Sequence, residues 1–200
     1  MRPSQETKRF WLMMYAMDAF QNVISSCQYL LENDFHVAGP MYRRIVTSIV
    51  TMYGRPFHNN YGVGKLEAGL VPTEYKQLHD QIIHERDKTH AHTDASGLNT
   101  RVGNANQVRL LRVKDGFKWV TCTYLPYDHG DLRNICRLCE VLVEKLNDET
   151  DKYEKRCIEV IKALPEGEYI LSLDEKADNI FIKVPSVLPP PDNIELTPIE

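Results

Sequence analysis

The densest group of chemically capable side chains lies at residues 86–94, where the sequence reads RDKTHAHTD. This segment holds two histidines, two cations and two carboxylates, in the order Arg86, Asp87, Lys88, His90, His92 and Asp94. Histidine titrates near neutral pH, and arginine keeps its charge and can bind a phosphate through two nitrogens. A segment of this composition can therefore move protons and stabilise negative charge on a phosphate.

The spacing within this segment decides which side chains can act together. On a helix, Arg86 and His90 are four residues apart and share a face, as do Lys88 and His92. Arg86 and His92 are six apart, so they converge only if the helix unwinds between them or a second subunit supplies one of them. The simpler alternative is structural: Arg86 and Asp87 bridge or cap helices, and the histidines are exposed. Both interpretations stay open on spacing alone.

The cysteines provide the next candidate site. Cys136 and Cys139 have the C-x-x-C spacing of metal and redox sites, but no second pair follows them, and a structural zinc ion needs four ligands. They also fall within an amphipathic helical pattern. The chain has five cysteines, an odd number, and no export signal. We therefore predict reduced thiols that pack as small hydrophobic side chains and hold no metal.

Two further patterns are weaker. His79 and His84 are five residues apart, which places them on different helix faces, unlike the histidines of an HExxH zinc helix. We predict both as surface histidines. The segment Gly62-Val-Gly64-Lys65 lacks the spacing and the hydroxyl residue of a phosphate-binding P-loop.

Composition sets the broad class. The chain has 200 residues, 42% of them hydrophobic and 26% charged, which is typical of one globular domain. No apolar run has the length of a membrane span, and the N-terminus does not resemble a signal peptide, so we expect a soluble cytoplasmic protein. Residues 1–139 carry 17 Lys/Arg against 13 Asp/Glu, whereas residues 140–200 carry 7 against 15. This distribution argues against a general nucleic-acid coat but allows a local basic face.

Apolar periodicity predicts the elements that must position these residues. Steps of three and four predict a long helix over residues 5–33, a second over residues 41–53 that starts at Pro40, and a third that opens at Thr73 as a possible N-cap. Residues 130–164 predict one long helix, or two joined near residues 147–150. We expect the first and last helices to pack antiparallel.

Shorter-period patterns complete the expected architecture. Residues 107–125 alternate around an Asp-Gly turn and predict a β-hairpin, and residues 168–184 predict a second one. The fold class is thus mainly α, a helical bundle with small β-hairpin additions over residues 1–184. The proline-rich residues 185–200 are expected to form a flexible tail.

The segment at residues 86–94 resembles the RDKxxAHxD signature of HEPN-superfamily proteins, in the branch that includes abortive-infection proteins and related phage and bacterial proteins. The preceding sequence fits as well: YRRIVTSIVTMYGRPF, then N-x-G-V-G-K-L, then LHDQIIHERDK. The resemblance covers roughly residues 10–95. Five residues separate Arg86 from His92 here, whereas the commoner family motif has four.

This resemblance implies a HEPN-like helical bundle, a homodimer with the motifs of both subunits near a shared cleft, and a metal-independent endoribonuclease without a cofactor. His92 would act as the acid–base residue on a ribose 2′-hydroxyl, and Arg86 would stabilise charge on the phosphate. Asp87, Lys88, His90 and Asp94 would support them. The expected setting is prokaryotic or phage defence, with RNA as partner. The alternative is a non-enzymatic dimeric module that binds a protein partner, and the acidic charge of residues 140–200 favours it.

Overall fold

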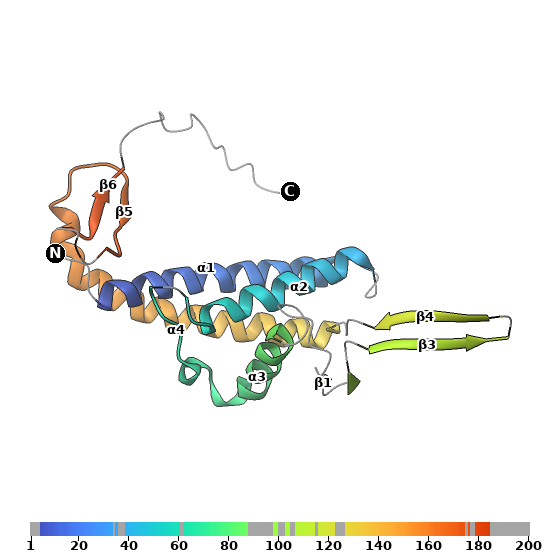
Figure 1. The fold of residues 1–200 in the computed structure, drawn as a ribbon. Helices are drawn as coiled ribbons and strands as arrows, with labels where there is room; N and C mark the ends of the chain where they lie inside the picture. The colour runs from blue at the N-terminus through green and yellow to red at the C-terminus, as the bar shows by residue number, and fades with distance from the viewer. Residues whose placement is uncertain are drawn as a thin grey trace.

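The computed structural model describes most of the chain and shows a mainly helical protein (Figure 1). The described residues are 5–33, 35, 39–60, 62–87, 98–99, 103–104, 107–114, 116–122, 127–174, 176 and 179–184. The mainly α fold with small antiparallel strand pairs that the sequence predicts is confirmed. The proline-rich residues 185–200, predicted as a flexible tail, lie outside the described residues.

Two long helices form the body of the molecule: α1 (Gln5–Glu32) and α4 (His129–Lys162). They run antiparallel along their length, as predicted (Figure 1). Near the start of α1, Phe10 stacks on Tyr153 of α4 with ring centroids 4.3 Å apart. α4 is one continuous helix, so the alternative of two helices joined near residues 147–150 is excluded.

Two shorter helices cover this pair: α2 (Pro40–Gly54) and α3 (Lys76–Glu85). α2 begins at Pro40, where the fixed φ and the missing N–H of proline are tolerated. The prediction that Thr73 caps the third helix is wrong. Thr73 starts a 3₁₀ turn, η3 (Thr73–Tyr75), and Tyr75 occupies the N-cap position of α3 without a side-chain hydrogen bond.

Short 3₁₀ turns and strands connect and extend the helices. Two further turns follow α2, namely η1 (Arg55–Phe57) and η2 (Ala68–Leu70). Within the described ranges, the antiparallel strand pairs are β1 (Leu98–Asn99) with β2 (Gly103–Asn104), β3 (Gln107–Val113) with β4 (Gly116–Cys122), and β5 (Tyr169–Leu171) with β6 (Phe181–Lys183). The β3–β4 hairpin, predicted from its Asp-Gly turn, projects from the end of the bundle at which α4 begins (Figure 1).

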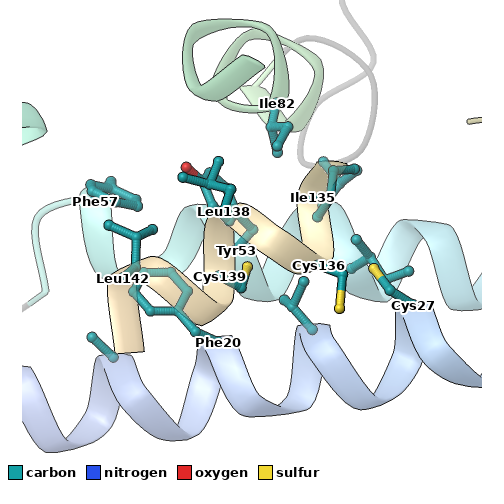
Figure 2. Close-up of a cluster of buried hydrophobic side chains, with 14 of the residues drawn as sticks. Phe20, Cys27, Tyr53, Phe57, Ile82, Ile135, Cys136, Leu138, Cys139 and Leu142 are labelled. Carbon is teal, nitrogen blue, oxygen red and sulfur yellow. The ribbon is translucent and has the colours of Figure 1, made fainter. Parts of the chain in front are cut away.

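A hydrophobic cluster joins α1, α2, α3 and α4. Figure 2 shows Ile82 of α3 directed towards Leu138 of α4, and below them Phe20 of α1. The thiols of Cys27, Cys136, Cys139 and Cys157 are buried and free. The prediction that the C-x-x-C pair packs in the core is therefore confirmed. Among the residues that the structure describes, no helix has an apolar stretch long enough to cross a membrane.

Candidate functional site

The structure describes two of the six residues that the sequence predicts as a site. Arg86 and Asp87 follow α3 directly, with Arg86 at its C-cap position. The other four lie outside the described residues: Lys88, His90, His92 and Asp94. The predicted convergence of Arg86 with a histidine of this segment therefore stays a prediction.

The backbone of Arg86 is fixed because the last turn of α3 is tied to two other helices. Glu85 is buried, and its carboxylate accepts a hydrogen bond from Gln81 at 3.0 Å and another from the Tyr127 hydroxyl. Tyr127 immediately precedes the N-cap of α4, and its carbonyl accepts a hydrogen bond from Tyr42 of α2. This buried network holds the end of α3 against α2 and the start of α4.

The side chain of Arg86 lies against Gly54, the last residue of α2. A Cβ added at Gly54 would sit 3.1 Å from both Cγ and Cδ of Arg86, closer than ordinary van der Waals contact. The backbone of Gly54 is helical, so glycine is not needed there for its φ angle. Its role is to let the arginine stem pass close to the helix end.

Within the part of the chain that the structure describes, the nitrogens of the Arg86 guanidinium differ in their hydrogen bonding. Its Nη1 donates to Oδ1 of Asp87 at 2.9 Å. Its Nε is buried and has no hydrogen-bond partner, and no described hydrogen bond uses Nη2. Nε and Nη2 form one edge of the planar guanidinium, with a geometry that matches two oxygens of a phosphate or carboxylate. A buried donor without an acceptor is costly and uncommon, so this edge is suited to an incoming anion.

His58 reaches the same carboxylate from the loop after η1. Its Nε2 lies 3.2 Å from Oδ1 of Asp87, within ion-pair distance but not aligned as a hydrogen bond. Burial lowers the pKa of His58, and the positive charges of Arg86 and Lys65 add to this effect, while Asp87 opposes it. The side chains of Arg86, His58 and Asp87 remain 21%, 32% and 39% exposed, so solvent reaches all three. We call these three residues the Arg86 cluster.

A tight turn holds the loop that carries His58. The backbones of Asn60 and Gly64 exchange two hydrogen bonds of 2.8 and 3.0 Å, and the Asn60 side chain donates to the His58 carbonyl at 2.9 Å. Gly62 and Gly64 have φ values of 80° and 88°, which glycine adopts without strain. Gly62 and Gly64, whose spacing does not match a P-loop, thus form the turn beside the Arg86 cluster.

The prediction that His79 lies on the surface is wrong. His79 is buried, its Nδ1 lies 2.8 Å from the Tyr53 hydroxyl, and the Phe57 ring meets its ring edge-on at a centroid distance of 4.5 Å. Burial is the main reason that its pKa is lowered. His84 is exposed, as predicted. His79 is therefore part of the core that supports η1.

The C-x-x-C thiols are chemically quiet. Burial raises the pKa of Cys136 to about 11 and that of Cys27 to about 12, and it holds the pKa of Cys139 well above its usual range. The reactive and metal-binding form of cysteine is the thiolate, which these surroundings disfavour. Across the part of the chain that the structure describes, no three His, Cys, Asp or Glu side chains are grouped as a metal site requires.

A separate pocket of about 400 Å³ lies between α1, α4 and the loop around Lys65. Arg9 and Glu149 span one side of it at 3.6 Å, and its remaining lining is largely apolar. Its described lining includes no residue of the Arg86 cluster and no histidine.

Sequence reasoning missed His58, Gly54, Glu85 and Tyr127 as residues that build the site. Gly54 and His58 are the first and last residues of the GRPFH segment, whose turn-forming residues predict a loop but not its neighbours in space. No family model matches the chain, and no curated protein or solved structure shows significant similarity to it. The assignment of function therefore rests on the site itself and on the sequence signature.

Proposed function

We propose that this protein is a HEPN-like RNA-binding protein that cleaves RNA without a metal ion, in prokaryotic or phage defence. The observation that carries the proposal is Nε of Arg86, a buried donor without a hydrogen-bond partner beside a histidine and a carboxylate, at the edge of the guanidinium that Nε forms with Nη2. Such an edge fits a phosphodiester, and the RDKxxAHxD signature supports the same assignment. No cofactor takes part in the proposed reaction.

The reaction would use the substrate's own 2′-hydroxyl as nucleophile. His92 would take the proton of this hydroxyl while O2′ forms a bond to phosphorus and the bond to the 5′-oxygen breaks. Arg86 would stabilise the negative charge that develops on the phosphate oxygens, an effect worth about 3–4 kcal/mol by analogy with oxyanion donors. The products would be a 2′,3′-cyclic phosphate and a free 5′-hydroxyl.

The deciding experiment incubates the purified protein with mixed RNA in EDTA. We expect cleavage to persist, the upstream product to end in a 2′,3′-cyclic phosphate, and a 2′-deoxy substrate to be inert. His92→Ala should slow cleavage about 10²- to 10⁴-fold. If His90→Ala abolishes cleavage and His92→Ala does not, the base is His90. Full activity on DNA, or strict dependence on magnesium, would exclude this mechanism.

A matched pair of arginine variants tests the two-nitrogen edge directly. Arg86→Ala removes the charge and the edge, and we expect a loss of rate of about 10²- to 10³-fold. Arg86→Lys keeps the charge but not the fork of donors, so it should recover only a small part of that loss. Full recovery with lysine would show that the site needs a positive charge alone.

We also propose a homodimer in which both subunits bring this segment to a shared cleft, and light scattering at micromolar concentration tests it. A monomeric mass would exclude a composite site. The rival function is a dimeric interaction module that binds a protein, and it is favoured by the acidic charge of residues 140–200. A dimer that neither cleaves nor binds RNA would support this rival.

A further inference from the structure

The proposed reaction leaves one proton transfer unassigned. An alkoxide is a poor leaving group, so the 5′-oxygen must receive a proton as its bond to phosphorus breaks. His92 would be occupied with the 2′-hydroxyl proton at the same moment. A second proton-transfer group beside the phosphate would complete the reaction.

We propose that His58 is this group: resting on the proposed function, its imidazolium gives a proton to the leaving 5′-oxygen, with Asp87 orienting the ring. Nε2 of His58 and Nη1 of Arg86 both approach the same Oδ1 of Asp87, at 3.2 and 2.9 Å. The imidazole and the guanidinium are therefore neighbours.

Asp87 contacts only one of the two ring nitrogens of His58. Asp87 lies at Nε2, and among the described residues no hydrogen bond to Nδ1 is seen, so the transferred proton is assigned to Nδ1. In the protonated ring both nitrogens carry a hydrogen, one directed to Asp87 and one available to the leaving oxygen. After transfer, the neutral ring keeps Nε2–H towards Asp87, and the proton resides on the new 5′-hydroxyl.

The surroundings of His58 shift the pKa of its imidazole. Burial and the positive charges of Arg86 and Lys65 lower the pKa of the imidazole, whereas the negative charge of Asp87 raises it. A lowered pKa makes the imidazolium a stronger acid, and the nearby carboxylate keeps part of the population protonated. His84, which is exposed on α3, provides a matched histidine that is not one of the three cluster residues.

A substrate with an altered leaving group tests the role of His58. In an RNA with a single cleavable linkage, sulfur replaces the bridging 5′-oxygen, and a thiolate leaves without a proton because thiols have a pKa of about 8.5. We expect His58→Gln to slow cleavage of normal RNA about 10²- to 10⁴-fold and to leave the sulfur substrate near the wild-type rate. His92→Ala should slow both substrates, and His84→Gln neither.

Asp87→Asn provides a second test, the pH profile of the cleavage rate, which would not shift if His58 had only a structural role. Removing the carboxylate lowers the pKa of His58, so the high-pH limb of the rate profile should move to lower pH. Equal slowing of both substrates by His58→Gln, or no slowing of either, would overturn this role and leave the proposed function intact. Failure of the wild-type protein to cleave RNA would overturn both. Thermal unfolding of each variant confirms that it is folded.

Discussion

His58 and His79 differ in how their ring nitrogens are paired. His79 is buried between helices and pairs with the Tyr53 hydroxyl at 2.8 Å. His58, the residue after Phe57, is one-third exposed and meets Asp87 without an aligned hydrogen bond. A buried polar atom that has a partner stabilises a fold, whereas buried polar atoms without a partner in a partly exposed cluster mark a place where a ligand could supply the partner.

The same difference separates the two surroundings. Around His79, aromatic rings fill the space between α2 and α3, with Tyr53 and Phe57 at a centroid distance of 5.5 Å. Around His58, one carboxylate oxygen of Asp87 lies within 3.2 Å of the imidazole and 2.9 Å of the Arg86 guanidinium, and a buried Arg86 nitrogen has no acceptor. The aromatic region thus supports the loop that carries His58, and the Arg86 cluster holds the polar groups that a ligand can contact.

Among the changes that test this comparison, the largest expected effect comes from displacing Arg86 without changing any polar atom of the cluster. Gly54→Ala places a Cβ 3.1 Å from Cγ and Cδ of Arg86, so the arginine stem must shift. We expect the rate of RNA cleavage to fall by up to about 10²-fold, since small displacements of a catalytic group have effects of this size. Stability should hold, because alanine is favoured over glycine in a helix by about 1 kcal/mol.

The control for this change is Gly69→Ala. A Cβ at Gly69 meets nothing within 4 Å, so both rate and stability should stay at wild-type values. Unchanged cleavage by Gly54→Ala would mean that the position of Arg86 is less constrained than its packing indicates.

In the aromatic region around His79, by contrast, a substitution should lower the stability of the fold. Tyr53→Phe removes the hydroxyl at 2.8 Å from Nδ1 of His79 and leaves that nitrogen buried without its partner. We expect the free energy of unfolding to fall by about 1–3 kcal/mol, measured by urea denaturation. Tyr29→Phe, at a side chain that is 51% exposed, should change it by less than about 0.5 kcal/mol. Equal effects of the two changes would contradict the structural role of His79.

Periodicity predicted the helices well because packing follows the spacing of apolar residues. α1, α2 and α4 begin and end within a few residues of the predicted positions, and the hairpin forms around its Asp-Gly turn. Periodicity failed where a contact joins distant segments. His79 was predicted on the surface because nothing in the local sequence shows that Tyr53 lies against it.

The site was predictable only in part, for the same reason. Arg86 and Asp87 stand out because charged and titratable residues are dense around them. His58 lies 28 positions before Arg86 in the chain and is one histidine among seven. Only the packing of α3 against the end of α2, which Gly54 permits, brings it to Asp87.

A smaller effect concerns the pH dependence of stability. The pKa of His79 is lowered in the folded protein, so the unfolded chain binds a proton first as the pH falls below about 6.5. Stability should therefore fall with decreasing pH, by at most about 1.4 kcal/mol per pH unit for one proton, and level off below the folded pKa. His58 contributes in the same direction. Urea unfolding between about pH 8 and pH 5 measures the slope, and His79→Gln should reduce it. A slope that His79→Gln leaves unchanged would contradict the burial of a neutral ring.

The smallest expected effect is the response of the core thiols to reagents and metals. Cys27 and Cys136 have pKa values of about 12 and 11, and Cys139 is fully buried, so hardly any thiolate exists at about pH 8. We expect an alkylating reagent to leave these three unmodified in the native protein and to modify them after unfolding in urea, as read by peptide mass spectrometry. Elemental analysis should find no stoichiometric zinc. If the protein instead contains about one zinc per chain, and Cys139→Ser loses it, the C-x-x-C pair is a metal site. The buried thiols would then have a functional role beside that of the Arg86 cluster.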